Sequence, residues 1–210
     1  HGVRRGRTAF LVNHGSFNPP HQGHVIMMEA ARRRLEGAGY SVAFGILAPV
    51  DAGHIRGKGA EPLPLETRVR LCDASCAGAG REWLSCDGRG VGYRSASQMI
   101  KRLLGEENPG MIGFSVCGAD VAARYHPRGP TVCVARPGSD MVAESSAGPL
   151  YCVREEVGEF SSTAVRAALE NGDGATILRL CGAPVARELG IEIAGGPHEE
   201  SATPPCAPWC

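Results

Sequence analysis

Long hydrophobic segments are missing from this 210-residue sequence, and its charges cancel. No apolar run approaches the roughly 20 residues that a membrane-spanning helix needs, and there is no secretory signal pattern. Lysine and arginine together number 22, as do aspartate and glutamate. General nucleic-acid binders and proteins of membrane surfaces need a positive field, so we expect neither kind of partner for this chain.

Cysteine is present, but without the spacing of a metal site. None of the nine cysteines belongs to a Cys-x-x-Cys pair. Cys72 and Cys76 are four residues apart and have no matching second pair, so a zinc site is disfavoured. Most of the cysteines stand among apolar residues. This predicts small, buried thiols in a reducing compartment, the cytoplasm or the nucleus.

Short apolar runs alternate with segments of helical periodicity along most of the chain. We expect strands at 8–13, 41–48, 82–86, 111–117, 131–135 and 150–153, and helices at 25–35, 65–77, 95–104 and 162–170. In the second of these helices, Leu65, Val69 and Cys72 mark the expected buried face. Uniformly apolar strands alternating with helices predict an α/β fold, a doubly wound parallel sheet with helices on both faces.

The length fits one domain. We expect this domain to span residues 1–193. From residue 194 onward the chain is polar and rich in proline, without periodicity, which predicts a disordered tail over 194–210.

The loop after the first expected strand has an unusual composition. It reads GSFNPPHQGH, from Gly15 to His24, and opens a helix. Glycine lets a ligand approach the backbone, and the free N–H groups of a helix start attract phosphate. His21 and His24 are three residues apart and can share one side of the first turn. We interpret them as part of a cradle for a polyphosphate; structural histidines or half of a transition-metal site are the alternatives.

Two further segments carry polar residues where ligands bind in such folds. The string FSSTAVR, residues 160–166, offers hydroxyl caps, a second helix N-terminus and an arginine, Arg166, one turn after Ser162. Alone, it also matches an ordinary capped helix with a surface arginine. In the other segment, Asp120 follows a buried strand. Its carboxylate can bind ribose hydroxyls or cap the next helix.

Together these segments resemble the HxGH nucleotidyltransferases, and within them the nicotinamide/nicotinate mononucleotide adenylyltransferase family. GSFNPPHQGH and FSSTAVR match the two phosphate-binding motifs of that family, and VCGAD and VCVARPG are similar to further segments in the same order. The similarity runs from Ala9 to Leu189. It implies a Rossmann-like nucleotidyltransferase domain.

The resemblance also implies a reaction and its substrates. The adenylyl group of ATP would move to nicotinamide mononucleotide or its nicotinate analogue, giving NAD or its deamido form and pyrophosphate. Mg²⁺ would be bound mainly by phosphates and water, with few protein ligands; the sequence assigns no residue as a metal ligand. A homo-oligomer is compatible with this family.

Residue roles follow from the same resemblance. The catalytic residues would be His21 and His24, which contact the ATP phosphates, and Arg166. With Arg166, Ser162 and Thr163 would hold the β- and γ-phosphates. The other nucleotide-binding positions would be Gly15, Ser16 and Phe17 on the substrate-phosphate side, Lys58 as a phosphate ligand, Gly118, Asp120 facing ribose, and Arg136.

Two alternatives belong to different classes. One is another HxGH adenylyl- or cytidylyltransferase, such as a phosphopantetheine adenylyltransferase, and the other is a non-catalytic nucleotide-binding module. A class I aminoacyl-tRNA synthetase is disfavoured because a KMSKS-like loop is missing. Relatives often stack the pyridine ring on a tryptophan between the positions of Asp120 and Arg136. This sequence has none there, so the candidates for stacking are Tyr93, Tyr125 and Trp83.

Overall fold

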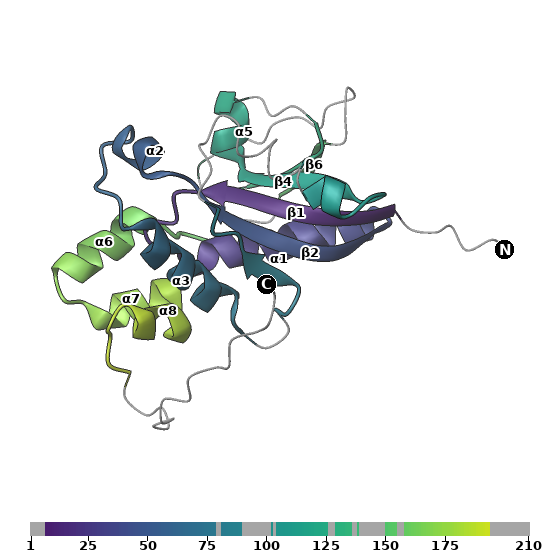
Figure 1. The fold of residues 1–210 in the computed structure, drawn as a ribbon. Coiled ribbons are helices and arrows are strands. Elements are labelled where there is room, and N and C mark those ends of the chain that lie inside the picture. Colours follow the sequence, from purple (N-terminus) through teal and green to yellow (C-terminus); the bar gives the residue numbers. More distant parts are fainter. Residues whose placement is uncertain are drawn as a thin grey trace.

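A parallel sheet forms the centre of the molecule (Figure 1). The computed structural model describes residues 7–78, 81–89, 102, 104–125, 129–135, 138, 150–154 and 158–193. Within them, six strands are hydrogen-bonded in the order β3-β2-β1-β4-β5-β6, and every neighbouring pair is parallel. The strands are β1 Arg7–Gly15, β2 Tyr40–Pro49, β3 Leu84–Cys86, β4 Ile112–Gly118, β5 Thr131–Val134 and β6 Leu150–Val153. The expected doubly wound α/β fold is confirmed.

The sheet is built around β1. This strand pairs with β2 on one side and with β4 on the other, so that Leu11 lies between Gly45 and Phe114. Its residues from Ala9 to Asn13 are all buried. A continuous buried run is typical of a parallel strand that is covered on both faces.

Two long helices cover one face of the sheet. They are α1, Gln22–Gly37, and α3, Leu65–Cys76. Val25, Met28 and Leu35 of α1 join the main hydrophobic core together with the sheet residues of that face. Helix α1 begins at Gln22, three residues before the start that its apolar periodicity predicts, so its first turn contains the end of the histidine-containing loop.

The opposite face is covered by α5, Ala119–Tyr125, and by the segment that contains Leu104. Ala122 of α5 packs against Cys133 and Cys152, and Leu104 packs with Phe10 of β1. Helix α5 was not among the expected helices. Most of the expected helix 95–104 lies outside the described residues.

Three short helices form a separate small core with α3 (Figure 1). They are α6 Ser162–Glu170, α7 Gly174–Cys181 and α8 Ala183–Glu188. Only α6 was expected. Leu71 of α3 packs with Val165, Ile177 and Val185, one residue from each short helix. The chain beyond residue 193 lies outside the described residues, so the tail over 194–210 stays a prediction.

Two local features differ from the sequence-based expectations. Between the expected strand 41–48 and the expected helix 65–77, where no element was expected, the chain contains a helical turn, α2, Ala52–Arg56. Asp51 caps it by accepting a 2.9 Å hydrogen bond from the His54 N–H. In α3, Leu65 and Val69 are only half-buried, whereas Arg68 is completely buried. A helix turns about 100° per residue, so Arg68 shares the face of Cys72 in spite of its charge.

The described cysteines are free thiols, as expected. Five of the seven are buried, and burial raises the pKa of Cys76 to about 12 and that of Cys181 to about 11. They pack as small apolar side chains. Within the described ranges, no helix is both long and apolar enough to cross a membrane.

Candidate active site

A crevice opens where the strand order reverses, between the carboxyl ends of β1 and β4. In doubly wound sheets this is the position at which ligands bind. The cavity there has a volume of about 300 Å³. Nine of the expected site residues line it: Gly15, Ser16, Phe17, His21, His24, Lys58, Gly118, Asp120 and Ser162. The fold thus brings together segments that lie far apart in the sequence.

Four rings form a continuous stack along one wall. The centroids of His21 and His24 are 3.8 Å apart, with their planes inclined by 24°. Phe17 meets the far side of His24 edge-on at 4.7 Å, and Phe160 lies 6.0 Å from His21. The two imidazoles are therefore buried between aromatic rings, with exposed fractions of 5% and 9%. This packing fixes their orientation before any ligand binds.

A backbone contact indicates which nitrogen of His24 carries the proton. The N–H of His21 lies 3.1 Å from His24 Nδ1, and only an unprotonated nitrogen can accept this hydrogen bond. His24 Nδ1 is also 3.2 Å from the carbonyl oxygen of His21, where a protonated Nδ1 would be the donor. The backbone N–H always carries its hydrogen, so we assign Nδ1 as acceptor. The neutral ring then keeps its proton on Nε2.

The second motif is fastened to the first by side-chain hydrogen bonds. Ser161 caps helix α6 by accepting from the N–H groups of Thr163 and Ala164 at 3.1 and 3.4 Å. The Ser162 hydroxyl donates to the Pro19 carbonyl oxygen at 2.8 Å. Arg166 Nη1 donates to the carbonyl oxygen of Asn18 at 2.8 Å, and its Nη2 to Thr163 Oγ1 at 3.1 Å. The N-terminus of α6 thus lies beside the loop that opens α1.

The same loop is also held from its other side. Asn18 is 1% exposed, and its side chain bonds twice to the segment before α3. Its Nδ2 donates to the Glu61 carbonyl oxygen at 2.8 Å, and its Oδ1 accepts from the Leu63 N–H at 2.7 Å. The loop is therefore clamped between α6 and the chain that leads into α3.

Eight residues of the cavity wall were not among the expected site residues: Asn13, His14, Met27, His54, Cys117, Val121, Phe160 and Ser161. Phe160 and Ser161 begin the FSSTAVR string that the sequence analysis singled out, and His54 stands four residues before Lys58. Burial, and then the charge of Lys58, lower the pKa of His54 below 6.5. A group with this shift is neutral at pH 7 and gains a proton more easily once an anion lies beside it.

Two polar atoms of this wall are buried and unsatisfied. Asn13 Nδ2 and Ser16 Oγ have no hydrogen-bond partner in the described part of the chain. Buried donors without partners are costly, and they are found where a ligand or water completes the bonding. Their position beside the glycine loop fits a polar ligand at the end of β1.

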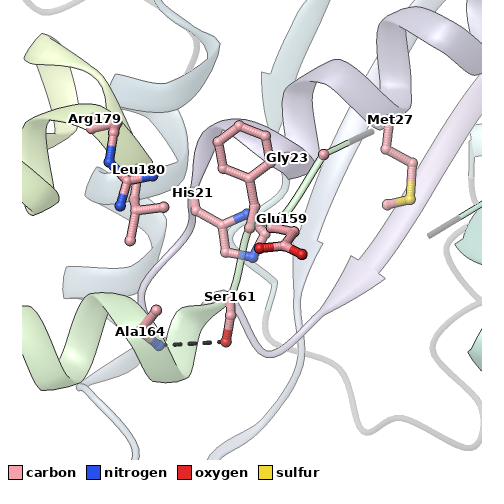
Figure 2. A pocket seen from close by; sticks show the side chains of 10 residues that line it. His21, Gly23, Met27, Glu159, Ser161, Ala164, Arg179 and Leu180 are labelled. Carbon is pink, nitrogen blue, oxygen red and sulfur yellow. Dashed lines mark hydrogen bonds between the residues drawn. The ribbon is translucent and has the colours of Figure 1, made fainter. Parts of the chain in front are cut away.

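A second, larger cavity shares part of its wall with the first (Figure 2). Its volume is about 500 Å³, and its walls combine apolar side chains with Glu159 and Arg179 at the rim. Both cavities are lined by His21, Met27, Phe160 and Ser161. Figure 2 shows Arg179 and Leu180 on one side of His21 and Met27 on the other. Each volume lies in the range of small-molecule sites.

Some candidate residues are not part of these walls. Thr163 and Arg166 follow the wall residue Ser162 on α6 but do not line the first cavity. Trp83 packs under the guanidinium of Arg32 at 4.8 Å and lines neither cavity. Arg136, Tyr93 and the Tyr125 side chain lie outside the described residues. One alternative interpretation of His21 and His24 is that they form half of a transition-metal site. Within the described ranges, there is no cluster of three His, Cys, Asp or Glu side chains that could hold a metal.

The chain belongs to the cytidylyltransferase-like family, whose sequence model matches residues 12–168. This span includes both phosphate motifs, the end of β1 and all of the other five strands. The resemblance to the nucleotidyltransferases is therefore confirmed at the level of family and fold.

Individual relatives narrow the comparison. A nicotinamide/nicotinic acid mononucleotide adenylyltransferase of Oryza sativa subsp. japonica is 43% identical over 75 residues, which are 36% of this chain and 28% of that protein. The enzyme of the same name from Arabidopsis thaliana is 41% identical over 66 residues, 31% of this chain and 26% of that protein. The matched segments thus span about a quarter of these relatives. A solved structure of Plasmodium falciparum nicotinic acid mononucleotide adenylyltransferase with NaAD covers 87% of this chain and 94% of its own, with a TM-score of 0.62 and 10% identity.

Proposed function

We propose that this chain transfers the adenylyl group of ATP to nicotinamide mononucleotide or its nicotinate analogue, releasing pyrophosphate and NAD or its deamido form. The observation that carries the proposal is the pair of adjoining cavities that meet at the stacked histidines. A reaction that joins two nucleotides needs two pockets with a shared boundary. The polar groups at this boundary are suited to phosphate, which is where the two substrates react.

The side chains that line the two cavities differ in polarity, and on this difference we assign one substrate to each cavity. Met27, Phe160 and Leu180 give the larger one apolar walls suited to a purine ring, so we place adenosine there. The smaller one contains Lys58 and the glycine loop, which suit a phosphate, and Asp120, which suits ribose hydroxyls. We place the mononucleotide there.

The chemistry needs no nucleophilic side chain. An oxygen of the mononucleotide 5′-phosphate attacks the α-phosphorus of ATP, and the bond from that phosphorus to the bridging oxygen of the β-phosphate breaks. The attacking phosphate is already ionised at pH 7, so no general base is required. The protein aligns the two phosphates and stabilises the charge that develops on the α-phosphate and on the leaving pyrophosphate.

This chain offers donors for that charge at the cavity boundary. We assign the Nε2–H of His24 and the imidazole of His21 to the ATP phosphates. Arg166 uses two of its five N–H groups in the bonds to Asn18 and Thr163, so three remain for the β- and γ-phosphates. The hydroxyl of Ser162 already donates to Pro19, so its contribution to phosphate comes from its backbone N–H at the start of α6.

Mg²⁺ fits this site as an ion carried by the nucleotide. Asp120 is the one carboxylate among the described residues that line the smaller cavity, and Mg²⁺ commonly takes one or two carboxylates together with phosphates and water. When bound, the ion would neutralise charge on the transferring phosphates. Arg136 stays a proposed nucleotide ligand. The buried free thiols support a reducing compartment, the cytoplasm or the nucleus.

A direct assay tests the proposal. The protein is mixed with ATP and Mg²⁺, and with nicotinamide mononucleotide, nicotinate mononucleotide or phosphopantetheine in parallel reactions. We expect dinucleotide and pyrophosphate in equal amounts from a pyridine mononucleotide, and the ratio of the two rates gives the preferred form. Product from phosphopantetheine alone would point to the other branch of the family. ATP binding without any product would support the non-catalytic module.

A further inference from the structure

The interior of the molecule contains a buried cation that the sequence-based analysis placed nowhere in the site. Arg68 lies in α3 with an exposed fraction of 0%, and it forms no ion pair with any described residue. Burying an arginine without a carboxylate is costly, and here burial lowers the pKa of its guanidinium. The hydrogen bonds that Arg68 makes must therefore offset the cost of its burial.

Those contacts are all with backbone carbonyl groups around the glycine loop. Arg68 Nη1 donates to the carbonyl oxygens of Ser16 at 3.0 Å and Val50 at 2.7 Å. Its Nε donates to the Leu63 carbonyl oxygen at 3.1 Å. The Val50 N–H in turn donates to the Gly15 carbonyl oxygen at 3.0 Å. Arg68 thus ties the end of β1, the end of β2 and the start of α3 together from behind the cavity.

The contact with Ser16 fixes the direction of one peptide group. In a trans peptide the C=O and the following N–H point in opposite directions. The Ser16 carbonyl points to Arg68, inside the protein, so the N–H of Phe17 points away from it, to the cavity side of the loop. Within the described part of the chain, this N–H makes no hydrogen bond. Gly15, Ser16 and Phe17 line the cavity, whereas Arg68 does not.

The backbone at Phe17 needs this support. Its φ is +43°, in the left-handed region that costs a residue with a side chain about 1–2 kcal/mol. It is the one non-glycine residue with a positive φ among the described residues. An unfavourable conformation of this kind persists only where the surroundings determine it. The bond from Arg68 to the preceding carbonyl is one of those determinants, and the packing of Phe17 against His24 is another.

We propose that Arg68 is a positioning residue that aims the Phe17 N–H at the phosphate of the acceptor substrate. This inference rests on the proposed function for the identity of the acceptor, and on the peptide geometry for the anion-binding role. Arg68 does not touch the substrate. It holds the donor in place, and its charge behind the loop adds to the attraction for a phosphate monoester.

The first test uses the unmodified protein and inorganic phosphate alone. In ¹⁵N-labelled protein, we expect the amide signal of Phe17 to shift on titration with phosphate, and chloride at equal ionic strength to leave it in place. If the chemical shift of the Phe17 amide does not change on addition of phosphate, the inference is overturned, irrespective of the results for the variants. This readout does not depend on which acceptor the enzyme uses, so it separates a failure of the inference from a failure of the proposed function.

The second test compares Arg68→Met and Arg68→Lys with Cys72→Ala. Cys72 is equally buried one turn further along α3, so its variant controls for a general loss of packing. For Arg68→Met we expect the KM for the mononucleotide to rise about tenfold or more, the scale of a lost bond to a charged group, with the KM for ATP unchanged. The phosphate-induced shift of Phe17 should be lost, and Arg68→Lys should restore part of both.

A purely structural role gives a different pattern. In that case Arg68→Met and Cys72→Ala would lower the Tm and leave the ratio of the two KM values as in the parent. If neither Arg68 variant folds, the titration of the unmodified protein decides the inference.

Discussion

Arg166 Nη1 donates a 2.8 Å hydrogen bond to the carbonyl oxygen of Asn18, which precedes it by 148 residues. This contact joins the two phosphate-binding motifs directly. The guanidinium therefore fastens the glycine loop, and three of its N–H groups are not used in its bonds to Asn18 and Thr163. In the proposed reaction, one side chain would couple the shape of the loop to the binding of the triphosphate.

Replacing Arg166 should affect catalysis more than folding. For Arg166→Ala we expect kcat/KM to fall about a hundredfold, because a donor to the developing charge is lost. Loss of the bond to Asn18 should cost about 1 kcal/mol in unfolding free energy. Steady-state kinetics and urea denaturation measure the two effects. Arg187→Ala, an exposed arginine of α8, is the control for the loss of one positive charge and should keep full activity. Equal activity of both variants would remove Arg166 from the site.

His24 is expected to be essential for turnover. His24→Ala removes the Nε2–H donor and the acceptor of the His21 N–H, so kcat should fall about a hundredfold or more. Gln22→Ala changes a side chain of the same helical turn that bonds to the Arg179 carbonyl oxygen, outside the histidine stack. Its rate should stay close to that of the parent. Unchanged turnover in His24→Ala would show that this ring has only a packing role.

Glycine at position 23 keeps the histidine stack in place. A Cβ there would lie 2.8 Å from the Cβ of Phe160 and 3.0 Å from His21 Nδ1. Gly23→Ala must therefore displace one of these groups, and a misplacement of this size is expected to lower kcat/KM about a hundredfold.

Gly37→Ala is the matched control for this substitution. Gly37 ends the same helix, and a Cβ there meets nothing within 4 Å. It should raise the unfolding free energy by about 0.5–1 kcal/mol and leave the kinetics alone. If both alanine variants behave alike, the packing around Gly23 is unimportant for the reaction.

The pH dependence of stability should carry a contribution from His54. Its pKa in the folded protein is below 6.5, so in the interval between the two values the unfolded chain binds more protons than the folded one. Stability therefore falls as the pH is lowered through 6.5 towards the folded pKa. We expect His54→Asn to lose less stability than the parent on acidification from about pH 7.5 to about pH 5.5. Thermal unfolding across this interval measures the difference, and parallel curves for the two proteins would contradict it.

The sheet and its long helices could be predicted because their patterns are local. The buried middle of a parallel strand such as β1 is a short apolar run, Ala9 to Val12, and a glycine-containing loop separates it from the next helix. The helices α7 and α8 were missed because, at 8 and 6 residues, they are too short to show a clear period. Their stability comes from packing on Leu71, which is a property of the tertiary structure.

Site residues could be predicted where they belong to a sequence motif. They could not be predicted where only the tertiary structure brings them to the site. The loop from Gly15 to His24 and the start of α6 are recognisable in the sequence, and the structure brings them together. His54 was missed, although it stands four residues before Lys58, because no helix was expected at α2. Arg68 was missed for a stronger reason. Its position three residues after Leu65 and four before Cys72 places it on the inner face, but its charge argues for the surface, and only the carbonyl groups of distant segments reverse that preference.

The bonds from Ser162, Arg166 and Cys181 to the carbonyl groups of residues 18–20 have a consequence for synthesis on the ribosome. The N-terminal loop emerges first and waits for more than 140 residues before its partners exist, as the separation of 143 between Ser162 and Pro19 shows. If the proposed function holds, a newly made polypeptide would therefore lack a complete phosphate site until α6 and α7 have been synthesised.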